Sequence, residues 1–201
     1  MKEEFYTKKR WLNWINKVKE SKFKLTENED DKAGAIFVYI MDDVVLACLK
    51  IIARCEREVI PPEEAMTEIE KIKEIVFEKQ DSLGEDADMM FESLKSSLAV
   101  VFVSCQRYIA GEFDKATPLN LMIKNALDAE NKEKVDDAFD VLSQVGARVI
   151  AGEVLPEEAV SELPYSMSAE LLDGIDAISA AMIGDDSYKE DDGTDEGGDE
   201  L

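Results

Sequence analysis

Residues 107–113 read RYIAGEF, and residues 148–154 read RVIAGEV. In both stretches an apolar helical rhythm ends at an isoleucine, and a glycine follows two residues later, at Gly111 and Gly152. Glycine adopts a positive φ at little cost, and the position after a helix end often requires one. Arg107 and Arg148 then lie in a last turn, where a cation faces the negative end of the helix dipole. The two stretches therefore predict helix ends and not a ligand-binding signature.

The second stretch belongs to a longer repeat. Residues 42–69 align without a gap with residues 136–163, and nine of the 28 positions are identical. Both copies read as a helical hairpin: an acidic start, an apolar helix, an arginine near its end, a short turn, and then PEEA, in which proline and glutamates favour a first helical turn. Because Glu58 stands where the second copy has Gly152, we expect the first turn to be made differently. Internal duplication and convergence of two helical hairpins both explain the similarity.

Apolar residues recur at helical spacing along most of the chain. The longest such stripe contains Ile36, Ile40, Val44, Cys48 and Ile51, and no sustained period-two alternation predicts a strand. We therefore predict one all-α domain, residues 1–183, a bundle of seven or eight helices built from helical hairpins, followed by a disordered acidic tail, residues 184–201. The expected helices are 4–20, 31–57, 62–80, 86–110, 117–130, 133–151, 156–163 and 166–183.

Composition excludes several kinds of chemistry. The 201 residues carry a net charge of −23 and contain no histidine. Ser-His and Cys-His relays, most catalytic zinc sites and Glu-x-x-His di-iron sites are therefore excluded. The three cysteines lie in apolar helical patterns and are expected to be buried free thiols. We see no secretion signal and no membrane span, and we expect a cytoplasmic protein.

The N-terminal segment is the basic exception in this acidic chain. Residues 1–24 contain eight Lys/Arg against three Glu, and residues 25–201 sum to −28. At helical spacing Trp11 and Trp14 share one face with Ile15 and Val18, while Lys9, Arg10 and Lys17 lie on the other. Either the apolar face packs on the domain and the basic face offsets acidic neighbours, or this helix docks on a protein partner, an anionic membrane or RNA. The candidate partner-binding residues are Arg10, Trp11, Trp14 and Lys17.

Carboxylates form two weaker patterns. Glu130, Glu133 and Asp137 share a helix face that could hold Mg²⁺. The pairs Glu130/Glu133 and Glu170/Asp173 have the shape of the E-x-x-E and E-x-x-D pairs of all-helical nucleotide pyrophosphatases, at a longer separation. In a chain with 46 acidic residues such patterns arise readily, and solvated helix faces explain them better than a metal site does. We assign no catalytic residue, no metal ligand and no cofactor.

Two acidic pairs, Asp42-Asp43 and Asp136-Asp137, occupy equivalent positions in the repeat. Helix capping or placement in a first helical turn explains both pairs.

Four stretches together carry a family resemblance: FYTKKRWLNWINKVKES (5–21), DDVVLACLKIIARCE (42–56), RYIAGEFD (107–114) and ELLDGIDAISAAMIGDD (170–186). They resemble a family of small acidic proteins of methanogenic and halophilic archaea, characterised only as a domain of unknown function. The resemblance covers residues 4–184 and implies an archaeal cytoplasm. It brings no activity and no functional residues.

The sequence favours a non-enzymatic protein-interaction or adaptor protein that uses its N-terminal helix. The alternatives are a magnesium-dependent nucleotide hydrolase with helix-borne carboxylates and an RNA- or ribosome-associated protein that binds through Lys9, Arg10 and Lys17. The expected partner is a protein of unknown identity, nucleic acid is expected only at the N-terminal helix, and self-association is left open.

Overall fold

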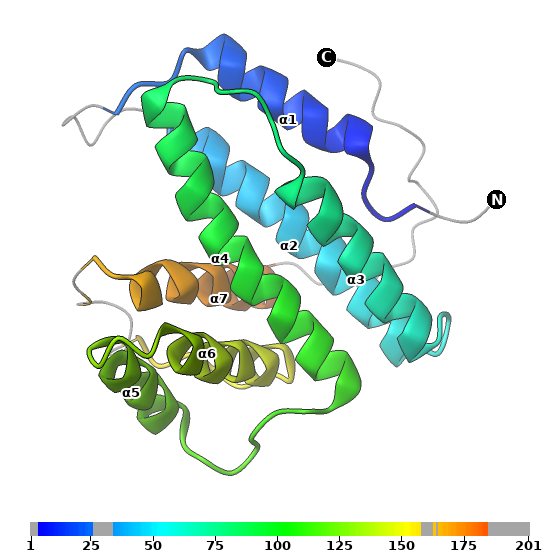
Figure 1. Ribbon diagram of the computed structural model, residues 1–201. Helices are drawn as coiled ribbons and strands as arrows, with labels where there is room; N and C mark the ends of the chain where they lie inside the picture. Colours follow the sequence, from blue (N-terminus) through cyan, green and yellow to red (C-terminus); the bar gives the residue numbers. More distant parts are fainter. Residues whose placement is uncertain (1–3, 26–33, 158–162, 164, 185–201) are drawn as a thin grey trace.

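The computed structural model of the chain describes residues 4–25, 34–157, 163 and 165–184. The described residues form seven α-helices and no strand, which confirms the all-α prediction (Figure 1). Residues 158–162, in the expected helix 156–163, and residues 185–201, in the expected acidic tail, lie outside the described residues. The helices are α1 (Lys8–Ser21), α2 (Ala35–Glu56), α3 (Pro62–Phe77), α4 (Glu85–Ala110), α5 (Leu119–Glu130), α6 (Val135–Ile150) and α7 (Met167–Gly184).

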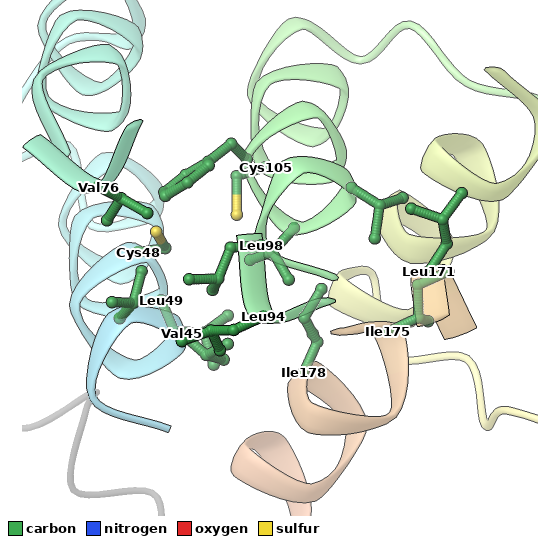
Figure 2. Close-up of a cluster of buried hydrophobic side chains, with 14 of the residues drawn as sticks. Val45, Cys48, Leu49, Val76, Leu94, Leu98, Cys105, Leu171, Ile175 and Ile178 are labelled. Carbon is green, nitrogen blue, oxygen red and sulfur yellow. The ribbon is translucent and has the colours of Figure 1, made fainter. Parts of the chain in front are cut away.

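Helix α4 holds the bundle together. It crosses the centre of the molecule and contacts α2 and α3 on one side and α6 and α7 on the other (Figure 1). Helix α1 lies across the outer end of the α2–α3 hairpin, and α5 packs on α6. Buried apolar side chains from all seven helices form one continuous core. Figure 2 shows its centre, where residues of α2, α4 and α7 meet.

The two glycine stops are confirmed as helix ends. Gly111 has φ 70° and Gly152 has φ 99°. At each stop the glycine N–H bonds the carbonyl three residues back, and the next N–H bonds the carbonyl of Arg107 or Arg148, five residues back. These paired bonds satisfy carbonyls that the helix end leaves open.

The expected difference at Glu58 is wrong. Glu58 has φ 57°, and the same two bonds form there: the Glu58 N–H donates to the Cys55 carbonyl, and the Val59 N–H donates to the Arg54 carbonyl. The first copy of the repeat therefore makes the same turn as the second. A glutamate takes the left-handed conformation that glycine takes at position 152.

Two glycines inside helices allow close packing. A Cβ on Gly174 of α7 would lie 2.3 Å from the Ser97 carbonyl oxygen of α4, and a Cβ on Gly146 of α6 would lie 2.1 Å from Ser104 Oγ. The Ser97 hydroxyl also donates a 2.8 Å hydrogen bond to the Glu170 carbonyl. Small residues thus set the spacing between α4 and the two helices packed on it.

The cysteines are free thiols, as predicted, with Cys48 and Cys105 fully buried and Cys55 half-buried. Cys48 and Cys105 lie in the same core cluster (Figure 2). The neighbouring Cys105 thiol, followed by burial, raises the pKa of Cys48. Both thiols therefore act as small apolar side chains. Among the described residues, no helix is both long enough and apolar enough to span a membrane.

Candidate functional site

Helix α1 begins four residues later than the sequence suggested, because Thr7 caps it. The Thr7 hydroxyl accepts a 3.0 Å hydrogen bond from the Arg10 N–H. The inner face of the helix buries Trp11, Ile15 and Val18. Trp11 is only 2% exposed, and its ring meets that of Phe91 of α4 edge-on, with centroids 6.2 Å apart. The aromatic inner face of α1 is therefore part of the core.

Asp43 of α2 fastens α1 to the body. Its carboxylate accepts hydrogen bonds from the Arg10 guanidinium, through Nε and Nη2, and a 2.7 Å bond from Trp14 Nε1. The Arg10 guanidinium also lies over the ring of Tyr6, 5.2 Å from its centroid. Burial, and then the negative charge of Asp43, raises the pKa of Tyr6. This cluster fixes the rotation of α1 about its own axis.

The placement of Asp43 corrects one sequence expectation. Helix α2 starts at Ala35 after Gly34, so Asp42 and Asp43 lie well inside the helix and do not cap it or occupy its first turn. Asp136 and Asp137 do lie in the first turn of α6, as predicted. The two acidic pairs are equivalent in sequence but not in structure, because α2 extends further toward its N-terminus.

The outer face of α1 is exposed and carries cations. Lys9, Asn13, Lys17 and Lys19 are all exposed. Lys17 Nζ lies over the half-buried ring of Trp14, 4.6 Å from its centroid. No ion pair within the described part of the chain involves Lys17 or Lys19, whereas Lys8 pairs with Glu78. Lys17 and Lys19 therefore present charge that no carboxylate in the described ranges pairs with.

The structure thus separates the four predicted partner-binding residues. Arg10 and Trp14 meet at Asp43, and Trp14 and Lys17 stack at the surface. Trp11 lies in the core, because the apolar face of α1 needs burial. A partner that docks on the folded chain can reach Arg10, Trp14 and Lys17 but not Trp11.

The carboxylates that suggested a metal site have other roles. The Glu130 carboxylate accepts the backbone N–H groups of Met167 and Ser168 at 2.9 and 3.0 Å, and thereby caps α7. Glu133 has φ 60° in the turn after α5, and Glu170 accepts a hydrogen bond from the Tyr165 hydroxyl. In the described ranges no group of three or more acidic or cysteine side chains is placed to hold a metal ion.

Sequence reasoning missed a groove between α2, α4 and α7. The groove has a volume of about 380 Å³, and each of the three helices lines it with four residues spread over two turns. Its apolar lining comes from Phe37, Val38, Met41, Met90, Leu94, Ala177 and Ala180. Three carboxylates also line the groove: Asp42, Asp173 and Asp176.

Two of the groove carboxylates have pKa values above the ordinary value for aspartate. Burial raises the pKa of Asp42. Burial, followed by the charges of Asp176 and Glu170, raises the pKa of Asp173. Both shifts mean that the ionised form is less well solvated here than in water.

A family model matches the chain over residues 4–191, and its description is "Uncharacterized protein conserved in archaea (DUF2150)". The chain belongs to this family. The match confirms the resemblance predicted from the four sequence stretches. Neither the curated proteins nor the solved structures contain a match to the chain.

The DUF2150 sequence held one local signal of the groove. Met41 and Met90 lie on apolar helical stripes, and a methionine at such a position is ordinarily predicted to be a buried core residue. That both line one groove depends on how α2 crosses α4 and on the place of α7, which comes much later in the chain. The groove is a property of the packing, so no single stretch of sequence predicts it.

Proposed function

We propose that this protein is a non-enzymatic cytoplasmic interaction or adaptor protein, and that the outer face of α1 is a contact surface for a protein partner. The observation that carries the proposal is the stack of the exposed Lys17 on the half-buried Trp14, on a chain of net charge −23. Tryptophan is enriched among the residues that dominate binding energy at protein interfaces, and a lysine held over its ring is attracted by the face of that ring.

The chemistry of this face selects an acidic partner segment. A carboxylate-rich strand or loop would find a cation at Lys17 and an aromatic edge at Trp14, with Lys19 as a further exposed cation across the helix. The surrounding negative surface would repel a partner that approached in another orientation, because like charges oppose association. The contact would therefore be small, oriented and sensitive to salt.

The alternative functions have less support. Glu130, central to the proposed carboxylate-metal site, already serves as the cap of α7. An RNA partner would meet few unpaired cations on α1 and a strongly acidic body beyond it, which disfavours binding to phosphates. We therefore favour a protein partner.

The test is affinity purification of the tagged full-length chain from native cells, followed by mass spectrometry. The informative variant is Lys17→Glu/Lys19→Glu, since both side chains are exposed and outside the core. A matched control, Lys124→Glu/Lys132→Glu, makes the same charge change at exposed positions elsewhere. Truncation of residues 1–24 is unsuitable because it removes Trp11 from the core.

We expect a specific partner that the control variant still recovers after nuclease treatment and that the α1 variant loses. Equal recovery by both variants would show that α1 is not the contact surface. Recovery that disappears on nuclease treatment would instead favour the RNA alternative.

A further inference from the structure

The groove between α2, α4 and α7 is a second surface, distinct from the outer face of α1. Its floor includes Leu94, which is 5% exposed and lies in the core cluster with Ile178 of α7 (Figure 2). Val38, at its edge, is 58% exposed. Apolar side chains are therefore continuous from the core to the solvent at this place.

The carboxylates of the groove lack cationic partners. No hydrogen bond or ion pair within residues 4–25, 34–157, 163 and 165–184 reaches the side chains of Asp42, Asp173 or Asp176. Asp42 comes from α2, and the two other carboxylates come from α7, so negative charge stands on both of these helices. The raised pKa values of Asp42 and Asp173 agree with carboxylates that are partly desolvated and uncompensated.

This combination selects one kind of ligand. Methionine side chains are flexible and polarisable, and they adapt to apolar groups of different shapes. A groove lined over two helical turns suits an amphipathic helix, whose apolar residues recur at i, i+3 and i+4. Carboxylates on its walls call for lysine or arginine beside those apolar residues. We propose that the groove between α2, α4 and α7 binds a basic amphipathic helix of a partner protein.

Charge argues against an occupant from this chain. The segments that precede α2 and follow α7, residues 26–33 and 185–201, carry net charges of −3 and −8, so the groove carboxylates would repel both. The basic helix of a second copy is unsuitable because its apolar face is already buried in its own core. The remaining occupant is a basic helix on a different protein.

The test uses the full chain and a synthetic 18-residue helical peptide of Leu, Ala and Lys as the probe. Fluorescence anisotropy measures its affinity, and a scrambled peptide of the same composition controls for charge alone. Asp173→Asn/Asp176→Asn removes the groove charge of α7, while Asp128→Asn/Glu112→Gln removes the same charge from exposed positions elsewhere. Ala180→Phe fills the groove at an exposed position, and Asn125→Phe adds the same ring on α5.

We expect the amphipathic peptide to bind more tightly than its scrambled form. Asp173→Asn/Asp176→Asn should weaken binding by about tenfold, as loss of a charge pair does at interfaces. Ala180→Phe should weaken binding by about the same factor, because the added ring occupies space in the groove. The two matched controls, and the α1 variant Lys17→Glu/Lys19→Glu, should bind within about twofold of the parent chain. That last result would separate this proposal from the one for α1.

Four results would overturn the proposal. Equal binding of the scrambled peptide, or equal weakening by Asp128→Asn/Glu112→Gln, would mean attraction by net charge alone. Unchanged binding by Ala180→Phe with an unaltered circular dichroism spectrum would place the peptide elsewhere. A dimer of the free chain that Ala180→Phe dissociates would assign the groove to a second copy.

Discussion

At the scale of single residues, local chemistry predicted the helix ends at Gly111 and Gly152 but not the matching helix end at Glu58. Gly111 and Gly152 follow an apolar rhythm at the place where a left-handed residue is needed, so the stops could be predicted from sequence. The same turn at Glu58 was not predicted, although the repeat aligns Glu58 with Gly152, because a non-glycine residue rarely adopts positive φ. Glu58 keeps the turn because the paired bonds to Cys55 and Arg54 outweigh the strain.

Glu58→Gly should therefore stabilise the protein. The left-handed conformation costs a non-glycine residue roughly 1–2 kcal/mol, and glycine's larger entropy loss on folding offsets part of the gain. We expect the free energy of unfolding to rise by about 1 kcal/mol, measured by urea denaturation. Gly152→Ala is the matched opposite, since open space surrounds a Cβ there and only the φ of 99° opposes it. It should lower the free energy of unfolding by a similar amount. A destabilised Glu58→Gly would contradict this account of the turn.

At the scale of elements, helical periodicity predicted seven or eight helices. The described residues form seven of them, with ends close to those expected, but periodicity did not predict how the helices pack. The start of α2 was misjudged by a few residues because Gly34 offers no side-chain cap to mark it. The groove and the Asp43 cluster were missed because both join residues from helices that are distant in sequence. The sequence left open whether the apolar face of α1 packs on the domain or docks on a partner. Only the tertiary structure shows that this face is buried in the core.

Gly174→Ala tests the contact between α4 and α7. The added Cβ would lie 2.3 Å from the Ser97 carbonyl oxygen, and a backbone atom cannot move aside as a flexible side chain can. Overpacking of this kind costs about 1–3 kcal/mol, so the midpoint of thermal unfolding should fall by several degrees. Gly34→Ala is the control, because a Cβ there meets nothing within 4 Å and the residue already has φ −69°. Equal stability of the two variants would mean that α4 and α7 are further apart than described.

At the scale of the whole molecule, the net charge of −23 opposes compact folding, and the groove adds to that cost. The folded state raises the pKa values of Asp42 and Asp173 above their unfolded values. Each ionised carboxylate therefore destabilises the folded chain. This free-energy cost of ionisation is absent below the unfolded pKa of about 3.9, and it is fully present once the pH exceeds the folded pKa.

Asp42→Asn/Asp173→Asn should consequently raise the midpoint of thermal unfolding at pH 7, and the gain should shrink as the pH falls toward 4. Asp128→Asn/Glu112→Gln controls for the general relief of charge repulsion, which any acidic residue provides. The groove variant should gain more at pH 7 than this control does. A gain that persists at low pH would show that the groove carboxylates are not desolvated.

The claim on which the α1 proposal depends is that this helix turns its aromatic face inward and its basic face outward. Trp11 and Trp14 are the two tryptophans of the chain, so Trp14→Phe leaves Trp11 as a single fluorophore at the buried position. The decisive measurement is acrylamide quenching of this variant. We predict blue-shifted emission that acrylamide quenches weakly until the protein is unfolded in urea. Red-shifted emission that acrylamide quenches as strongly in the native as in the unfolded protein would contradict the inward placement of that face.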